Sequence, residues 1–316
     1  MKKIYTLVLF VITFFSGNAQ IVDIPDGNFK AKLLQASPEN AIAVNAEGQY
    51  IKIDINDDGE IQENEALSVF QLDVSFSDIQ NLVGIEAFLN LTGLKCEYNQ
   101  LTSLDVSQNE ALKVLDCYIN QLTSLNITQN MALESLFCFE NQLTILDVTQ
   151  NIALDYLSCS NNQLTSLDVS QNITLLRLGC SFNQLTSLDV TQNSRLTNLY
   201  CGGNQLTSLF IKNNNQYWID LVFDENPNLE YVCVNENDLA MVQQKIIDYG
   251  YTNCHANSYC SFVPGGLFYT LQGNIKFDSN NNGCEVSDIN MPNQKLTFTS
   301  GALNSSLIPN ESGNYT

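Results

Sequence analysis

The fold is decided by the stretch LTGLKCEYNQLTSLDVSQNEA, residues 91–111, because the chain repeats it with small changes up to residue 214. The phrase returns every 21 residues, and an Asn-Gln-Leu triplet begins in each copy at Asn99, Asn120, Asn141, Asn162, Asn183 and Asn204. A cysteine stands three residues before each triplet, at Cys96, Cys117, Cys138, Cys159, Cys180 and Cys201. A strict period of this length predicts a solenoid, in which each coil buries its apolar face only against its neighbours.

Each copy fits the leucine-rich-repeat pattern L-x-x-L-x-L-x-x-N-x-L, with cysteine in place of the third leucine. Leu94 and Cys96 alternate with polar residues, so we expect both to point inward from a short strand. Leu104 and Val106 repeat this alternation in the second half of the copy, while Asp105 is expected to point outward. We therefore predict a mostly β solenoid with two short parallel strands per coil, joined by turns.

The cysteine column is predicted to consist of free thiols in the core. In-register residues on neighbouring strands lie about 4.8 Å apart with parallel side chains, whereas a disulfide needs Cβ atoms about 3.8 Å apart and a χ3 near 90°. Metal ligands would have to converge, and the column lacks the spacing typical of zinc sites. Buried cysteine behaves as a small hydrophobic residue. The asparagine column is predicted to satisfy backbone groups at the turns.

Length and charge limit the possible functions. The chain has 316 residues, enough for two or three structural units, and its net charge is −21. This charge argues against binding to nucleic acid and to anionic membrane surfaces, and it is compatible with cation binding.

Residues 1–19 have the pattern of a signal peptide: Lys2 and Lys3, an apolar run from Ile4 to Phe15, and a small-residue end at Gly17-Asn18-Ala19. The apolar run is too short to span a bilayer comfortably, so we predict cleavage and export and no transmembrane segment. Disulfides can form in an exported protein.

Residues 20–66 are predicted to form an N-terminal cap with a short helix in IPDGNFKAKLLQA and an EF-hand-like calcium loop. The loop sequence DINDDGEIQENE, residues 54–65, fits D-x-[DN]-x-[DN]-G-x5-E in full. The expected ligands are oxygen donors from the side chains of Asp54, Asn56 and Asp58, the backbone carbonyl of Glu60 and the bidentate carboxylate of Glu65. The alternative is an acidic surface loop that never binds metal. A structural Ca²⁺ ion would pin the cap onto the first coil.

The solenoid is predicted to cover residues 67–237, and its last copies are degenerate but keep register. Leu221 and Phe223 fall where Leu and Cys were, and Cys233 falls in the outward column that Asp105 begins. Residues 238–261 are predicted to form a C-terminal cap with a closing helix and a disulfide.

Four cysteines lie outside the ladder, at Cys233, Cys254, Cys260 and Cys284, and they allow three connectivities. We expect a bridge between Cys233 and Cys254, which would close the last coil, and leave the second pair open. Residues 267–316 show the alternation of β-strands and are predicted to begin a β-sandwich domain. A sandwich needs more strands than these, so we infer that more of the domain follows.

The positions that vary among the copies lie around the cysteine strand and are expected to face outward. Six of them are aromatic, at Tyr98, Tyr118, Phe137, Phe139, Phe182 and Tyr200. An exported solenoid has no folding need for exposed rings, and exposed apolar patches often mark contact sites. The alternative is that β propensity alone favours aromatic residues on a sheet surface. We predict that this face binds a ligand.

Nothing in the sequence argues for catalysis. The single histidine, His255, follows Cys254, which is better explained as a disulfide partner. A nucleophile elbow, a phosphate loop and an HExxH motif are all absent from the sequence. We therefore predict that the protein is not an enzyme.

The combination of IPDGNFKAKLL, the calcium-type loop, the LxxLxCxxNQLTSLDVSQN repeats and the YVCV segment resembles a family of secreted bacterial leucine-rich-repeat surface proteins with internalin-like repeats. The resemblance covers residues 21 to about 260. It implies export, often by type IX secretion, and adhesion to a protein or glycan ligand at the cell exterior. We expect a monomer with this role. The alternative is a structural spacer or targeting arm of a larger surface protein or exported enzyme.

Overall fold

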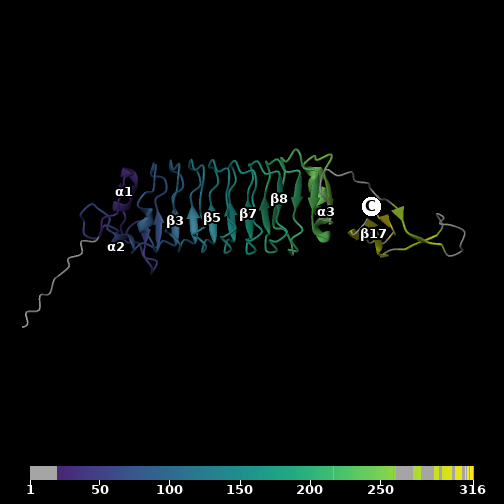
Figure 1. Cartoon of the computed structure of the whole chain (residues 1–316), viewed down its shortest axis with the longest axis horizontal. Helices are drawn as coiled ribbons and strands as arrows, with labels where there is room; N and C mark the ends of the chain where they lie inside the picture. Colours follow the sequence, from purple (N-terminus) through teal and green to yellow (C-terminus); the bar gives the residue numbers. More distant parts are fainter. Residues whose placement is uncertain are drawn as a thin grey trace, which may run out of the picture. The chain divides into compact units, whose positions relative to one another are not determined.

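The computed structural model describes residues 20–215, 217–258 and 260, and parts of the chain beyond 272, namely 273–278, 288–291, 294–300, 303–307, 310, 312, 314 and 315. It divides into two compact units, Met1–Pro264 and Gly265–Thr316. The first unit is a solenoid of stacked coils, as predicted (Figure 1). The predicted signal peptide lies outside the described residues.

The main sheet of the solenoid has nine strands in the order β1-β2-β3-β4-β5-β6-β7-β9-β11. The strands are β1 (Ala43–Val44), β2 (Gln71–Asp73), β3 (Gly93–Lys95), β4 (Val114–Asp116), β5 (Ser135–Phe137), β6 (Tyr156–Ser158), β7 (Arg177–Gly179), β9 (Asn198–Tyr200) and β11 (Asp220–Val222). β1 is antiparallel to β2, and the later neighbours are parallel. Leu94 lies between Leu72 and Leu115, so the 21-residue period puts equivalent leucines side by side.

The second predicted strand of each coil forms only in the last coils. A parallel sheet in the order β13-β12-β10-β8 contains β8 (Ser187–Asp189), β10 (Ser208–Phe210), β12 (Tyr231–Cys233) and β13 (His255–Asn257). In earlier coils the described residues show one isolated bridge on this side, between Asp105 and Asn126. Leu104 and Val106 are nevertheless buried. The alternation of apolar and polar residues therefore indicates which side chains are buried. It does not by itself show that the backbone forms the hydrogen bonds of a strand.

The cysteine ladder is buried and unpaired, as predicted. All six cysteines of the repeats are 0% exposed and carry free thiols. Burial raises the pKa of each thiol, to about 12 for Cys159. Because the thiolate is the reactive form, these side chains are inert packing elements of the core.

Two asparagine ladders run through the solenoid, and they differ in their bonding. In the first, Nδ2 of Asn162 donates to the carbonyl oxygens of Cys138 (3.0 Å) and Cys159 (3.1 Å), and its Oδ1 accepts from the backbone N–H of Leu143 (2.9 Å). In the second, Nδ2 of Asn151 donates to two carbonyls of the preceding coil, and among the described residues its Oδ1 has no partner. The first ladder confirms the predicted role of the Asn-Gln-Leu triplets.

The residue before each triplet asparagine has a left-handed backbone. Its φ is positive at Tyr98, Ile119, Glu140, Asn161, Phe182 and Gly203. The φ is also positive at the equivalent residues Phe76, which precedes Ser77, and Glu225, which precedes Asn226. Bulky or β-branched residues rarely adopt this conformation, which glycine and asparagine tolerate. The turn after each strand therefore imposes strain that is largest at Ile119, with φ 52°.

The N-terminal cap contains α1 (Gly27–Leu34) and α2 (Glu63–Ala66), and the 3-10 helix η1 (Ile85–Ala87) follows within the solenoid. Asp26 caps α1 by accepting the backbone N–H groups of Asn28 (2.9 Å) and Phe29 (3.0 Å). Phe29 and Leu33 are fully buried, so the predicted helix packs with the predicted apolar face.

At the other end, η2 (Glu236–Asp238) leads into α3 (Leu239–Asp248), which buries Val242 and Ile246. The predicted bridge between Cys233 and Cys254 is wrong: the disulfide joins Cys233 to Cys260, with Cα atoms 5.3 Å apart, and Cys254 is a buried free thiol. In the parallel register of β12 and β13, Cys233 lies opposite Asn257, which is three residues from Cys254 and three residues from Cys260. The register therefore does not separate the two candidates, and the pairing is decided by the position of Cys260 after β13.

In the second unit the described residues form antiparallel pairs: β14 (Gly273–Asn274) with β19 (Asn314–Tyr315), β15 (Lys276–Phe277) with β16 (Ile289–Asn290), and β17 (Leu296–Ser300) with β18 (Leu303–Leu307). The β pattern of this segment is thereby confirmed for these residues. The β-sandwich remains a prediction, and Cys284 lies outside the described residues.

Candidate ligand-binding face and acidic loop

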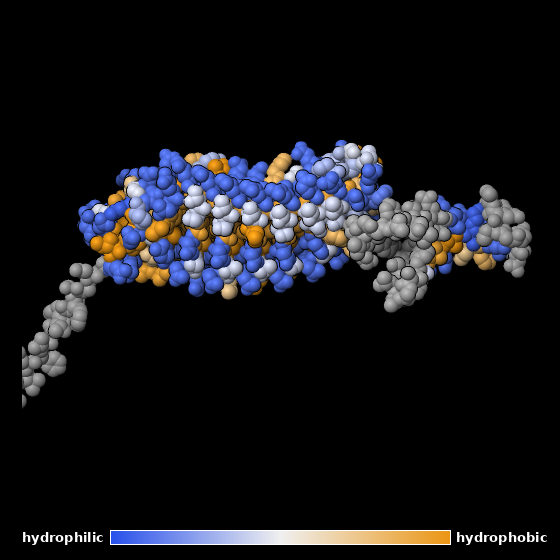
Figure 2. All heavy atoms as spheres, turned by 45° about the horizontal axis from the view of Figure 1, so that its top comes forward, coloured by the Kyte–Doolittle hydropathy of each residue, from blue (hydrophilic) through white to orange (hydrophobic). Residues whose placement is uncertain are grey.

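The outward face of the main sheet is built from in-register columns. Its leading column, at the last residue of each strand, consists of Asp73, Lys95, Asp116, Phe137, Ser158, Gly179 and Tyr200. Because side chains alternate along a strand, residues two positions later lie on the same side. The side chains of the leading column change from charged in the N-terminal coils to aromatic and then small in the middle coils. On the side of the solenoid that Figure 2 presents, apolar and weakly polar residues form a band between hydrophilic rows.

A ladder of aromatic rings runs over four successive coils. The rings of Phe76 and Tyr98 stack at 4.2 Å, Tyr98 meets Tyr118 edge-on at 5.7 Å, and Tyr118 stacks on Phe139 at 4.3 Å. These distances fall within the range of favourable aromatic pairs. The structure thus brings together three of the six predicted aromatic residues. Phe76 was missed, although it follows Val74 by two residues as Tyr98 follows Cys96.

The other three predicted rings lie apart from this ladder. Phe137 packs edge-on against Tyr156 at 4.7 Å, and the hydroxyl of Tyr200 donates to the carboxylate of Asp220 at 2.7 Å. The ring of Phe182 lies so close over Gly203 that a Cβ there would come within 2.5 Å of it. Phe182, Tyr98 and Tyr200 are exposed, whereas the other three predicted rings are half-buried. The six residues therefore do not form one continuous ladder of ring contacts.

Two acidic side chains beside the ring ladder, buried Glu97 and half-buried Asp116, each have a buried oxygen without a hydrogen-bond partner among the described residues. Glu97 is 7% exposed, and within the described chain its Oε2 and the Oδ1 of Asp116 have no hydrogen-bond partner. Burial, and then the neighbouring carboxylates of Asp116 and Asp73, raise the pKa of Glu97. Burial likewise raises the pKa of Asp116. This pair could not be predicted from the sequence, because both residues lie at outward positions where buried carboxylate oxygens are not expected.

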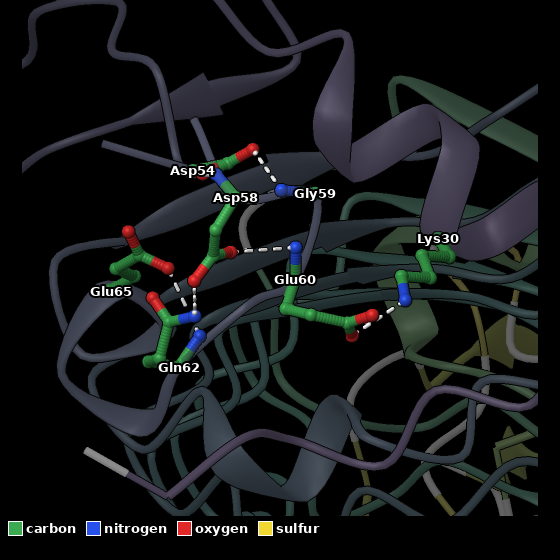
Figure 3. A network of polar contacts seen from close by, with 7 residues as sticks. All are labelled: Lys30, Asp54, Asp58, Gly59, Glu60, Gln62 and Glu65. Carbon is green, nitrogen blue, oxygen red and sulfur yellow. Dashed lines mark hydrogen bonds and ion pairs between the residues drawn. The ribbon is translucent and has the colours of Figure 1, made fainter. Parts of the chain in front are cut away.

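The acidic loop carries the predicted calcium ligands after α1, and its last residue, Glu65, lies in α2 (Figure 3). The carboxylate of Asp54 accepts the backbone N–H groups of Asp58 (3.2 Å) and Gly59 (3.1 Å). The carboxylate of Glu65 accepts those of Ile55 (2.8 Å) and Gln62 (3.0 Å). These bonds fold the loop around its own acidic side chains, and Gly59 at φ 78° allows the sharp turn.

The remaining predicted ligands complete the loop. Asp58 accepts from the backbone N–H of Glu60 (2.9 Å) and from Nδ2 of Asn56 (2.9 Å), and the first of these bonds leads the interactions that lower its pKa. Glu60 forms an ion pair of 2.6 Å with Lys30 of α1 (Figure 3). The loop is thereby fixed to the cap helix.

The donor set of this loop fits a hard cation such as Ca²⁺. Asp54 and Glu65 are 6% and 2% exposed, and no described Lys, Arg or His nitrogen lies within 4.0 Å of either carboxylate. A buried carboxylate without a counter-charge is unfavourable. In the side-chain positions described, however, no three acidic, His or Cys side chains converge closely enough to hold an ion. The side chains would have to exchange backbone N–H partners for the metal.

Strand order, period and asparagine ladder together define a leucine-rich-repeat solenoid. No family model and no curated protein matches the chain. Among solved structures, the functional domain of InlJ from Listeria monocytogenes, which includes a cysteine ladder, is 28% identical over 68% of this chain and 56% of that chain, with a TM-score of 0.38. A leucine-rich-repeat protein from Leptospira interrogans is 22% identical over 61% of this chain and 56% of its own, with a TM-score of 0.47. Internalin C2 from L. monocytogenes is 17% identical over 67% of this chain and 94% of its own, with a TM-score of 0.41.

This chain therefore matches little more than half the length of the first two of these structures. Within the part of the chain that the structure describes, no helix is long and apolar enough to cross a membrane.

Proposed function

We propose that the chain is an exported, non-catalytic binding protein whose strand face recognises a protein or glycan, as an adhesin does. The ring ladder of Phe76, Tyr98, Tyr118 and Phe139 is the observation that carries this proposal. The core is already filled by leucine and cysteine, so the rings are not needed to complete it. Phe76 and Tyr98 also occupy the strained left-handed position, where a large residue is a disadvantage for folding alone.

The disulfide between Cys233 and Cys260 supports export, because such bonds persist in oxidising compartments. We further propose that the acidic loop binds a structural Ca²⁺ ion. The buried carboxylates of Asp54 and Glu65 favour this, since a cation would neutralise them. Asp54, Asn56, Asp58, Glu65 and the carbonyl of Glu60 would hold it.

The test is a binding screen of the full chain against surface glycoproteins and polysaccharides. The double variant Tyr118→Ala/Phe139→Ala removes one stacked pair from the face. The matched control is Ile152→Ala/Ile173→Ala, which removes two exposed apolar side chains that lie outside the ring ladder. A ligand that is lost only in the first variant supports the proposal. A ligand retained by both variants contradicts the assignment of the face, and no ligand at all would favour the spacer role.

A further inference from the structure

Two carboxylate oxygens on the strand face lack a partner. Glu97 and Lys95 lie on the same side of one coil, and Asp116 lies in register with Lys95 on the next coil. Oε2 of Glu97 and Oδ1 of Asp116 are buried and accept no hydrogen bond from the described residues. A buried polar atom of this kind is rare in folded proteins and calls for an explanation such as a missing ligand.

Lys95 forms no ion pair with either carboxylate, although its positive charge lies near enough to oppose the rise in the pKa of Glu97 and of Asp116. It lies between Asp73 and Asp116 in the column, and its side chain is exposed. The ion pairs of the described residues are Lys30 with Glu60, Lys52 with Asp57 and Lys113 with Glu134, and none involves Lys95. Three carboxylates and one ammonium group therefore leave the site with an excess of acceptors for a cation.

The rings beside these carboxylates favour a flat organic cation. The carboxylates of Glu97 and Asp116 lie close enough to raise the pKa of the Tyr118 hydroxyl, after burial itself, so ring and acids share one site. Tyr118 stacks one face on Phe139 and Tyr98 stacks one face on Phe76. The edge-on contact between the two tyrosines covers a second face on only one of them, so the second face of the other has no ring against it. A guanidinium group is planar, can stack on an aromatic face and can donate to two carboxylates at once. A metal ion is a poorer match, because the site offers two unpartnered carboxylate oxygens, fewer than the about six to eight oxygen ligands that Ca²⁺ takes.

We propose that this site, formed by Glu97, Asp116, Tyr98 and Tyr118, binds an arginine side chain from a basic segment of a partner protein. The proposal rests on the proposed function of the strand face and names the chemistry that it recognises. The strong negative charge of the chain would also steer a basic partner toward it.

The experiment measures binding of a fluorescent tetra-arginine peptide to the full chain, with tetra-lysine and tetra-citrulline peptides as probes. Citrulline keeps the shape of arginine without its charge. We expect arginine to bind best and citrulline not to bind. The double variant Glu97→Gln/Asp116→Asn should weaken arginine binding by about tenfold or more, because it removes both charged partners. Tyr118→Leu should reduce the preference for arginine over lysine, because it removes the stacking surface.

The control is Asp147→Asn/Asp168→Asn, which removes the same charge from an exposed column. Asn126 occupies that column in another coil and accepts the same local bond from Thr128 as Asp147 does from Thr149, so the substitution is native-like. The control should change binding less than about twofold, as expected for exposed charges. Equal weakening in both double variants would overturn the proposal in favour of non-specific attraction, and so would equal binding of citrulline. If Ca²⁺ competes with the arginine peptide on the wild type but not on Glu97→Gln/Asp116→Asn, the site binds an inorganic cation and the proposal is overturned. If a ligand from the screen needs Tyr118 and Phe139 but not Glu97, the strand face stands and the arginine site fails.

Discussion

The carboxylate of Asp26 accepts a hydrogen bond from the backbone N–H of Gln80 at 2.8 Å, across 54 residues of sequence. The same oxygen accepts from Asn81 at 3.1 Å, while the other oxygen caps α1. One side chain thus joins the cap helix to the loop of the first coil. Burial alone would raise the pKa of Asp26, but its four backbone bonds outweigh burial and lower it.

We predict that Asp26→Asn lowers the free energy of unfolding by about 1–2 kcal/mol, because the amide presents N–H groups to Gln80 and Asn81. Since the folded pKa lies below the unfolded value, the wild-type advantage is present above about pH 4 and is lost as the pH falls through the folded pKa. Urea unfolding at neutral and acid pH measures both effects. A difference between the two proteins that does not shrink in acid would contradict the assignment.

The two asparagine ladders should differ in their contribution to stability. Asn162→Ala orphans the N–H of Leu143 and the carbonyls of Cys138 and Cys159, so we expect a loss of about 3 kcal/mol or more. Asn151→Ala should cost about 1–2 kcal/mol less, because it also removes an oxygen that has no partner. Chemical denaturation of the two variants tests the order. Equal losses would show that the unpartnered oxygen is satisfied in solution.

The left-handed position allows a matched pair of substitutions with opposite signs. Ile119→Asn should stabilise the protein by about 0.5–1 kcal/mol, because asparagine tolerates positive φ better than a β-branched residue. Gly203→Asn should destabilise it by about 1–3 kcal/mol, because the new Cβ would meet the ring of Phe182. Thermal melting of both variants is the measurement. Adding Phe182→Ala to Gly203→Asn should recover much of the loss, and failure to do so would show that the ring is not the obstacle.

Glu97 should lower stability at neutral pH, as expected of a residue kept for binding. Its folded pKa is raised above the model-peptide value of 4.5, so ionisation is easier in the unfolded chain. Stability linked to this group is therefore complete below about pH 4.5 and is lost as the pH rises through the folded pKa. We expect Glu97→Gln to melt above wild type at pH 7 and together with it near pH 4. A variant that melts lower than wild type at pH 7 would show that the carboxylate is satisfied in the free protein.

Calcium should raise the melting temperature of the wild type if the acidic loop binds it, because a ligand that binds only the folded state stabilises that state. Glu65→Gln should abolish the rise. Asp57→Asn makes the same change of charge within the loop at a residue that is not a predicted ligand, and it should keep the rise. Each variant is compared in calcium and in chelator, so that loss of the Glu65 backbone bonds is not mistaken for loss of metal. An unchanged wild type would remove the calcium proposal.

The period predicted the solenoid and its register well, because each 21-residue copy must occupy one coil and place Leu94 beside Leu115. The disulfide was not predictable, because Cys254 and Cys260 lie at equal sequence distance from Asn257, the residue opposite Cys233, and nothing in the sequence distinguishes them. The candidate ligand-binding face was predicted only in part from the sequence. Variation among the copies identified Tyr98, Tyr118 and Phe139, but no single-residue pattern shows that Glu97 loses its contact with water.

Different interactions stabilise the two ends of the solenoid. The N-terminal end has the hydrogen bonds of Asp26 and the ion pair of Lys30 with Glu60, and the C-terminal end has the disulfide between Cys233 and Cys260. A solenoid whose coils contact only their neighbours would ordinarily unfold from its ends, one coil at a time. Because interactions stabilise both ends, we expect unfolding to begin between two interior coils, where it exposes the apolar faces of both coils to water. We therefore expect the solenoid to resist gradual fraying from its ends and to unfold more cooperatively than a stack with free ends.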